Sequence, residues 1–228
     1  MDNDKAMNLS RLGLRAGDGS DPLITGISVD SRQVRDGHLF AALPGSAAHG
    51  GEFIRYALRQ GAGAILTDRQ GAEIAAAELA ASQAALVVAE DPRAALAGAA
   101  ALWFQAQPDT VVAVTGTSGK TSVTTFTRQI WQALGHKAIS LGTMGVQGDY
   151  QAKLAHTTPD PLTLHRILAE AARDPEPYGR NARAYLRATV TEPVTPQDVS
   201  IGRVVLAACA IEPTLAKRWN GWIERVKT

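Results

Sequence analysis

The sequence has very little cysteine, no surplus of charge of one sign and no long apolar run. Its single cysteine, Cys209, excludes an internal disulfide and fits a reducing compartment, and its apolar neighbours indicate a small core residue. Lys and Arg number 23 against 22 Asp and Glu, so charge gives no reason to expect a nucleic-acid partner. No apolar stretch approaches the length of a membrane-spanning helix, and the N-terminus lacks a signal-peptide pattern. We therefore expect a cytoplasmic protein without a membrane partner.

Between residues 24 and 172, segments typical of strands alternate with segments typical of helices. The predicted strands are 24–29, 38–43, 64–67, 85–88, 111–114 and 138–141. The predicted helices are 51–60, 71–82, 92–104 with Asp91 as N-cap, 121–134, and one that ends near residue 172. This alternation predicts an α/β fold with parallel pairing of strands, and Gln107-Pro108-Asp109 suggests a domain boundary. Residues 1–23 are polar apart from the short segment Leu9–Leu14, and we expect them to run over the surface.

The segment from residue 111 to residue 134 has the pattern of a phosphate-binding loop. A β-branched strand, 111–114, leads into a glycine turn and then a helix; the turn reads Gly116, Thr117, Ser118, Gly119, Lys120, Thr121, Ser122. Free N–H groups at such a helix start attract phosphate, Lys120 would reach the outer phosphates, and the Thr121 hydroxyl would ligate Mg²⁺. Val114 stands where the full pattern has glycine, so a turn that merely caps the helix is the alternative.

Two further segments carry candidate contacts. Asp30-Ser31-Arg32 follows the first predicted strand, and Thr157-Thr158-Pro159-Asp160-Pro161 precedes the last predicted helix. Alone, the first could be a turn with a surface ion pair and the second a helix-capping segment. Together with the glycine loop, in this order, they resemble the Mur ligase family over about residues 20–172. The family's glycine loop has the short form seen here.

The resemblance implies an α/β fold with three parts. Residues 1–107 would be a Mur-type domain that binds the UDP end of the substrate, residues 108–172 the start of a P-loop ATP-binding domain, and residues 173–228 an unassigned tail. The implied uridine contacts are Val29 and Ser31. The implied diphosphate loop is Ser46, Ala47 and Ala48. Residues 116–122 would bind ATP, with Lys120 catalytic, and the contacts to the muramoyl peptide would be His156, Thr157 and Thr158.

The implied activity is that of the family branch that adds the third amino acid of the peptidoglycan stem peptide. The substrate would be UDP-MurNAc-L-Ala-D-Glu, activated by ATP and Mg²⁺ through an acyl phosphate and then attacked by an amine. The third amino acid could be diaminopimelate or lysine. The resemblance does not fix the oligomeric state, and we expect a monomer. The other histidines, His38, His49, His136 and His165, show no metal spacing, and we expect structural or surface roles for them.

The tail departs from the family pattern. It has no histidine, and its only lysines are Lys217 and Lys227, so the family's metal-site glutamate and histidine and its modified lysine have no counterparts there. We expect helices at 198–210 and 213–218 and a strand at 222–226, in a segment that a frameshift, a fusion or a genuine short domain would explain. A catalytically inactive module that binds UDP-muramoyl-dipeptide, ATP or both is the main alternative function, and an unrelated P-loop protein is a third.

Overall fold

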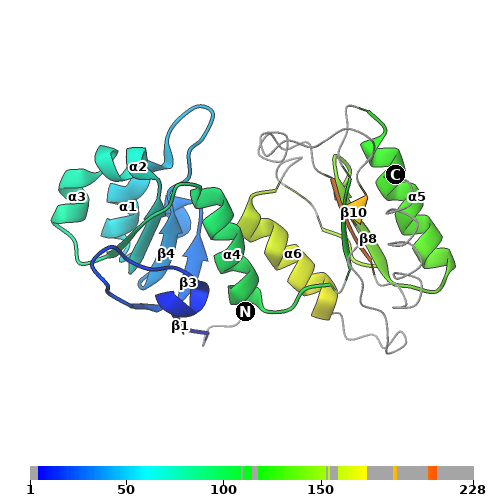
Figure 1. Cartoon of the computed structure of the whole chain (residues 1–228), viewed down its shortest axis with the longest axis horizontal. Helices are drawn as coiled ribbons and strands as arrows, with labels where there is room; N and C mark the ends of the chain where they lie inside the picture. The colour runs from blue at the N-terminus through cyan, green and yellow to red at the C-terminus, as the bar shows by residue number, and fades with distance from the viewer. Residues whose placement is uncertain are drawn as a thin grey trace, which may run out of the picture. The chain divides into compact units, whose positions relative to one another are not determined.

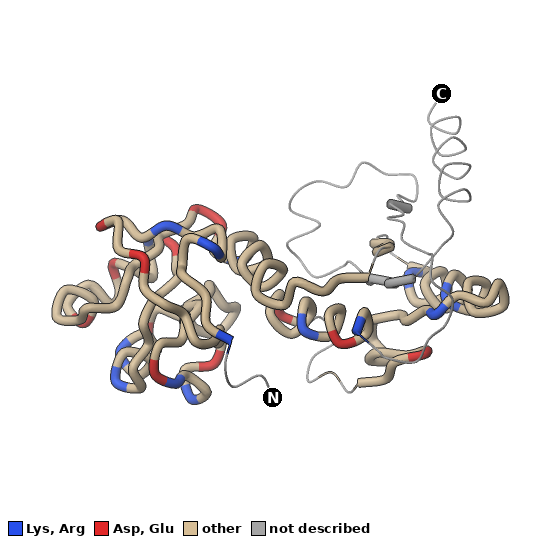
Figure 2. Tube along the Cα trace, turned by 90° about the horizontal axis from the view of Figure 1, so that it is seen from below, with Lys and Arg blue, Asp and Glu red and all other residues tan. Residues whose placement is uncertain are grey.

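The computed structural model describes residues 5–108, 110–114, 118–152, 154 and 159–173, and the backbone of 187–188 and 205–209. The chain divides into two compact units. The N-terminal unit is Met1–Gln105 with Pro161–Arg166, and the second unit is Ala106–Asp160 with Ile167–Thr228, so the division passes through helix α6 (Pro161–Arg173). Each unit is described by itself below; Figure 1 labels their helices and strands. Figure 2 shows Lys and Arg interspersed with Asp and Glu along the described trace.

The N-terminal unit is built on a four-stranded parallel sheet. Its strands follow the order of the chain: β3 (Gly26–Ser28), β4 (His38–Ala41), β5 (Ala64–Thr67) and β6 (Ala85–Val88). All three neighbouring pairs are parallel, with Phe40 opposite Ile65 in the central pair. The predicted parallel α/β layer is therefore confirmed, and the strands at 64–67 and 85–88 are predicted to the residue.

Apolar side chains cover both faces of this sheet, which is why its strands read as continuous apolar runs. Leu39 and Leu66 belong to a core that includes Leu96 of α4 (Pro92–Phe104). Phe40 and Ile65 face the other core, which includes residues of α1 (Ile54–Arg59). Helix α4 begins where expected, because the Asp91 carboxylate accepts a hydrogen bond from the Ala94 N–H at 2.9 Å.

The N-terminal segment does not follow the surface path that its polarity predicts. Strand β1 (Met7–Asn8) pairs antiparallel with β2 (Leu23–Ile24), and a 3₁₀ turn, η1 (Leu9–Leu12), follows β1. Leu9 and Leu12 are 0% and 1% exposed, because residues three apart in a 3₁₀ turn point the same way and both enter the core. The expected surface path is wrong for this part of the chain.

Two predicted helices are each divided in two. The segment predicted as 51–60 is a 3₁₀ turn, η3 (Gly50–Phe53), followed by α1. The segment predicted as 71–82 is α2 (Arg69–Ile74) and α3 (Ala76–Ala80), separated at the buried Ala75. Helix α2 starts earlier than predicted because Asp68 caps it by accepting from the Gly71 N–H at 2.7 Å.

The second unit contains a mixed sheet of five described strands. Their order is β10 (Arg187–Ala188), β7 (Val111–Val114), β11 (Val205–Cys209), β8 (Ala138–Gly142) and β9 (Gly145–Gly148). Helix α5 (Lys120–Ala133) follows β7, close to its predicted position. No strand is predicted directly after 138–141, and the structure adds the hairpin strand β9 there, paired antiparallel with β8.

The tail contains the clearest failure of the predicted secondary structure. Residues 205–209 fall in the predicted helix 198–210, yet they form β11, which pairs antiparallel with both β7 and β8. A short apolar run suits a buried strand as well as a buried helix, so its periodicity cannot separate the two. The predicted helix 213–218, the predicted strand 222–226 and the side chain of Cys209 lie outside the part of the chain that the structure describes.

Candidate functional site

A pocket of about 770 Å³ in the N-terminal unit collects part of the predicted uridine and diphosphate site. Val29 and Ser31, which follow β3, line it together with Ala48 from the loop after β4. We call it the N-terminal pocket. Ser46 and Ala47 are exposed on the same loop as Ala48 but do not line the pocket. The structure therefore brings three of the five predicted residues to one pocket and leaves two beside it.

The segment Asp30-Ser31-Arg32 forms one wall of this pocket through a local turn. Asp30 accepts from the Arg32 backbone N–H at 3.0 Å and begins a 3₁₀ turn, η2 (Ser31–Gln33). The Arg32 guanidinium also binds the Asp30 carboxylate at 2.7 Å, and this hydrogen bond lowers the pKa of that carboxyl below its usual value. The segment Asp30-Ser31-Arg32 thus forms a turn with an ion pair and also lines the pocket. Because the Arg32 side chain is 87% exposed, we assign the pair little stabilising energy.

Two exposed aromatic side chains line the N-terminal pocket although no motif predicted them. Phe53 and Tyr56 are 42% and 41% exposed, which is unusual for large apolar rings. Helical spacing over 51–60 predicts one apolar face shared by Phe53, Ile54, Ala57 and Leu58, and for Phe53 this is wrong. Residues 50–53 form a 3₁₀ turn. Its period of three residues turns the Phe53 side chain away from the face on which Ile54 and Ala57 are buried. The Arg55 guanidinium lies 4.6 Å from the centroid of the Tyr56 ring.

The loop that carries Ser46, Ala47 and Ala48 is closed at its base. Pro44 and His49 form an antiparallel bridge, and the Gly50 N–H donates to the Leu43 carbonyl at 2.9 Å. A Cβ on Gly50 would lie 2.6 Å from the backbone of residues 42 and 43, so the close approach at this base requires glycine. We call residues 44–49 the small-residue loop. Backbone N–H groups can approach an anion closely where side chains are small.

The start of α5 holds the described part of the predicted ATP site. Gly119, at φ 77°, occupies the N-cap and has no side chain to cap the helix; Lys120 and Thr121 form its first turn. The Thr121 hydroxyl is exposed and lies 3.5 Å from that of Thr143, while Ser118 and Ser122 are exposed beside it. This arrangement suits an anion at the helix start and one hydroxyl ligand for a hard cation. Gly116 and Thr117 lie outside the described residues.

The predicted muramoyl-peptide contacts His156, Thr157 and Thr158 also lie outside the residues that the structure describes. What the structure does describe nearby is Pro161, the first residue of α6.

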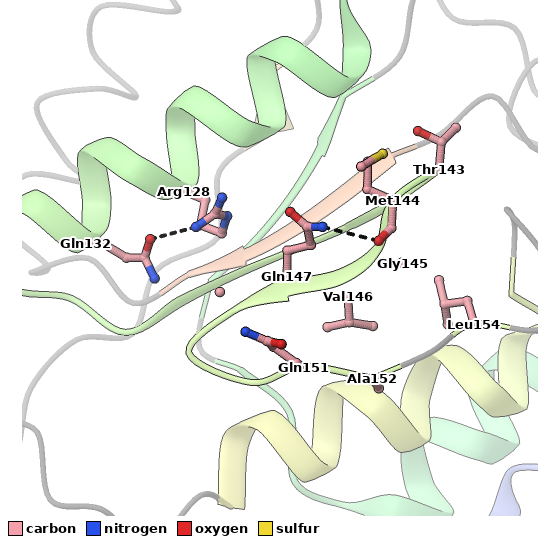
Figure 3. A pocket seen from close by; sticks show the side chains of 11 residues that line it. Arg128, Gln132, Thr143, Met144, Gly145, Val146, Gln147, Gln151, Ala152 and Leu154 are labelled. Carbon is pink, nitrogen blue, oxygen red and sulfur yellow. Dashed lines mark hydrogen bonds between the residues drawn. The ribbon is translucent and has the colours of Figure 1, made fainter.

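A second pocket, of about 820 Å³, lies within the second unit and was not predicted. It lies between α5 and the β8–β9 hairpin, and Figure 3 shows Arg128 and Gln132 of the helix facing the hairpin residues. Arg128 is already engaged, because its Nε donates to Ser140 Oγ at 3.2 Å and its Nη1 to Gln132 Oε1 at 2.7 Å. Thr143 lines this pocket and also approaches Thr121. One residue of the pocket lining thus lies beside the start of α5.

In the part of the chain that the structure describes, no helix is both long enough and apolar enough to cross a membrane. Within the same ranges, no group of three or more His, Cys, Asp and Glu side chains is placed to hold a metal ion.

Comparison with known families adds to this geometry. The profile described as "Mur ligase family, catalytic domain" matches residues 23–104, and that of the "Mur ligase middle domain" matches residues 114–178. The chain belongs to the Mur ligase family. The first match covers β2 to α4, and the second begins at the last residue of β7 and includes α5. The glycine loop and the N-terminal pocket thus lie in different Mur ligase domains.

Relatives of this Mur ligase chain are consistently much longer. A protein of Bradyrhizobium diazoefficiens named UDP-N-acetylmuramoyl-L-alanyl-D-glutamate–2,6-diaminopimelate ligase is 47% identical over 154 residues, which is 66% of this chain and 30% of the relative. A protein of Brucella melitensis with the same name is 46% identical over 165 residues, or 71% of this chain and 32% of the relative. The chain spans about 30% of the length of these relatives.

A solved structure of a ligase with that name shares the fold of this chain. The TM-score is 0.59 at 23% sequence identity, over 81% of this chain and 36% of the other. This similarity supports the Mur ligase fold alone, because the identity is low.

Proposed function

We propose that this chain is the N-terminal part of an ATP-dependent ligase that adds the third amino acid to UDP-MurNAc-L-Ala-D-Glu. The observation that carries the proposal is the N-terminal pocket, where Val29, Ser31 and Ala48 meet although they come from two different loops. By resemblance to the family, the first two contact uridine and the third belongs to the diphosphate loop. The domain assignments of 1–107 for the UDP substrate and 108–172 for ATP are part of the same proposal.

The start of α5 would hold ATP during carboxylate activation. Mur ligases use ATP, and transfer of its γ-phosphoryl group to the substrate carboxylate gives an acyl phosphate that an amine then attacks. Lys120 would hold the outer phosphates, and the exposed Thr121 hydroxyl would supply one oxygen ligand to Mg²⁺. A Mg²⁺ ion bound there would offset negative charge on the phosphates.

The incoming amino acid proposed here is diaminopimelate. The relatives cited above carry it in their names, whereas the motifs in this chain leave diaminopimelate and lysine equally open. UDP-linked precursors and ATP are cytoplasmic compounds, so the proposal also implies a cytoplasmic location, a small-molecule substrate and no nucleic-acid or membrane partner. We expect the chain to be a monomer.

A second candidate function is a module that binds the nucleotide substrates without catalysis. It is favoured by residues 173–228, which contain no histidine and only Lys217 and Lys227 as lysines. The family's remaining metal-site residues have no counterpart there. For this polypeptide acting alone, that composition favours binding over turnover.

Replacement of Lys120 tests the ATP half of the proposal. We expect Lys120→Ala to weaken Mg-ATP binding by at least about 100-fold, because the lysine charge on the phosphates is lost. Binding of UDP-MurNAc-L-Ala-D-Glu should stay within about twofold of the unaltered chain, since its proposed uridine and diphosphate contacts lie in the other unit and Lys120 is not among its proposed contacts. Isothermal titration calorimetry measures both affinities.

Gln129→Ala is the matched control, because Gln129 is exposed on the same helix away from its start. It should leave both affinities unchanged. Equal loss of both ligands in Lys120→Ala would show that the substitution unfolds the chain or that the sites are wrongly assigned.

A further inference from the structure

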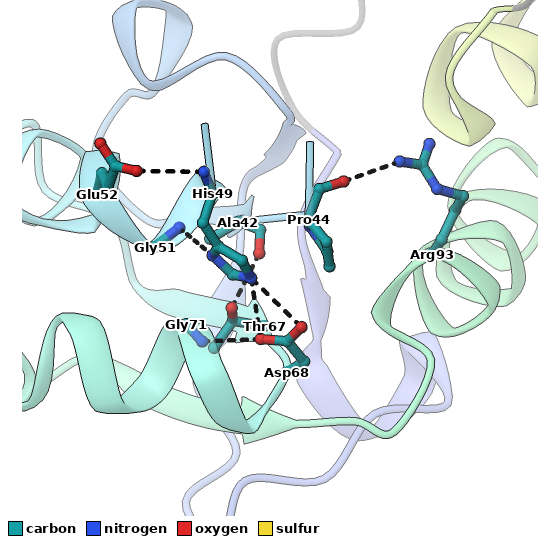
Figure 4. A network of polar contacts seen from close by, with 9 residues as sticks. All are labelled: Ala42, Pro44, His49, Gly51, Glu52, Thr67, Asp68, Gly71 and Arg93. Atoms are coloured by element: carbon teal, nitrogen blue, oxygen red, sulfur yellow. Dashed lines mark hydrogen bonds and ion pairs between the residues drawn. The ribbon is translucent and has the colours of Figure 1, made fainter. Parts of the chain in front are cut away.

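The small-residue loop, residues 44–49, is held at both ends by side chains from elsewhere in the N-terminal unit. Figure 4 shows these contacts. At the first end, Arg93 of α4 donates to the Pro44 carbonyl at 3.2 Å. At the other end, the imidazole of His49 points away from the loop tip and contacts Gly51 and Asp68. Ser46, Ala47 and Ala48 lie exposed between these two anchored ends.

The contacts of His49 define which ring nitrogen carries the hydrogen. Nδ1 accepts from the Gly51 backbone N–H at 2.9 Å, so the hydrogen of the neutral ring is assigned to Nε2. Nε2 lies 3.1 Å from one carboxylate oxygen of Asp68 and donates to that group. The ring is only 9% exposed, and both of its nitrogens have hydrogen-bond partners within the protein.

Asp68 is a rigid anchor for this ring. It directly follows β5 and caps α2 by accepting from the Gly71 N–H at 2.7 Å. Burial alone would raise the pKa of Asp68, but the hydrogen bonds from Gly71 and His49 outweigh it and lower that pKa below the usual value. Beneath it, the Thr67 hydroxyl donates to the Ala42 carbonyl at 2.9 Å and joins β5 to the end of β4.

Glycines leave the space that the imidazole occupies. A Cβ on Gly71 would lie 2.8 Å from His49 Cε1, and one on Gly51 would lie 3.0 Å from His49 Nδ1. His49 itself does not line the N-terminal pocket, although its neighbours Ala48 and Gly50 do. The His49 ring therefore does not face the pocket directly, and it can affect a ligand there only through the loop backbone.

We propose that His49, braced by Asp68, is a positioning residue that holds the small-residue loop ready to receive the diphosphate of the UDP substrate. This inference rests on the proposed function. An exposed loop of small residues loses conformational freedom when its N–H groups close on an anion, and a fixed base reduces that cost. The brace should therefore strengthen binding of the diphosphate. It should leave binding of the uridine group, which Val29 and Ser31 would contact, unchanged.

The experiment compares UDP with uridine in chains that lack the brace. His49→Asn keeps an acceptor for the Gly51 N–H but is too short to reach Asp68, and Asp68→Asn keeps an acceptor for Gly71 while removing the carboxylate. Titrations followed by ¹⁵N–¹H spectra give both affinities, even when they are weak. We expect each variant to bind UDP about tenfold more weakly and uridine within about twofold of the unaltered chain.

The double variant and a surface control sharpen this test. Because both substitutions break the same link, His49→Asn with Asp68→Asn should be no weaker for UDP than either alone. Arg69→Ala removes an exposed ion pair with Glu73 on the same helix and should change neither affinity. In the ligand-free chain, heteronuclear NOE values of residues 46–48 should fall in the two brace variants and not in Arg69→Ala.

Each outcome has a distinct meaning. Unchanged UDP affinity or unchanged NOE values in His49→Asn would overturn the positioning role. Equal loss of UDP and uridine would overturn it as well, because it would show that His49 only supports the fold of the unit. An unaltered chain that binds neither ligand would contradict the proposed function, and the NOE values would still decide whether the brace exists.

Discussion

Gly71 and Gly98 show at the scale of single residues how surroundings decide the effect of one substitution. Both lie in helices, α2 and α4, but a Cβ on Gly71 would lie 2.0 Å from Thr67 Oγ1, whereas one on Gly98 would meet nothing within 4 Å. We expect Gly71→Ala to lower the free energy of unfolding by about 1–3 kcal/mol, since the Thr67 hydroxyl must move from its buried bond. Gly98→Ala should raise it by roughly 0.5–1 kcal/mol through helix propensity.

Urea denaturation of the two variants checks this pair, each serving as the control for the other. Shifts of the same sign would contradict the packing argument, because glycine-to-alanine chemistry is identical at the two positions.

Single residues of the candidate site were predictable only where a motif marked them. Val29, Ser31 and Ala48 could be named because the family resemblance implies them, and they line one pocket. Tyr56 could not, because an aromatic residue at helical spacing is usually buried, and only the three-dimensional structure shows that its ring lines the pocket. His49 was expected to be structural, and its link to Asp68, 19 positions away, leaves no trace in local sequence.

Strand β11 gives a prediction at the scale of secondary-structure elements. Ala207 pairs with Val112 of β7 on one side and with Ser140 of β8 on the other. Proline at this position would remove an N–H from the middle of a strand with two neighbours. We expect Ala207→Pro to reduce hydrogen-exchange protection of β7 and β8 amides by at least about tenfold and to leave β3–β6 unchanged.

The matched control is Ala207→Val, which keeps the N–H and suits a strand. It should preserve protection in β7 and β8. Full protection of these strands in Ala207→Pro would contradict the pairing of β11 with them.

Elements were predictable where a local signal marked their ends. Helix α4 begins at Pro92 after a capping aspartate, and it was placed to the residue. Helix α5 was found by its apolar spacing, yet Phe126 and Ile130 are 60% and 57% exposed while Trp131 is 6% exposed. The apolar spacing therefore predicted where the helix lies but not which of its faces is buried, because the buried face depends on the elements packed against the helix. Strand β11 was missed since its partners lie far away in sequence.

At the scale of the whole chain, the order of motifs was more informative than any one of them. The glycine loop lacks the glycine of the full pattern at Val114, yet its place after the Asp30-Ser31-Arg32 segment allowed the family to be predicted, and the family matches confirm it. What the tail contributes could not be predicted in the same way. The family matches end at residue 178, and the chain spans only about 30% of the relatives it matches.

The composition of residues 173–228 leads to a prediction about the activity of this chain. With Mg-ATP, UDP-MurNAc-L-Ala-D-Glu and diaminopimelate together, we expect no ADP release above that of a sample without protein, because the tail has no histidine and no matched lysine to complete the metal site. The UDP substrate should nevertheless raise the melting temperature, since a ligand at 100 times its Kd stabilises the folded chain by about 2.7 kcal/mol. Lys120→Ala should keep this shift and lose the one caused by Mg-ATP. ADP release that requires all three compounds would overturn this expectation and show that the tail or a partner subunit supplies the missing groups.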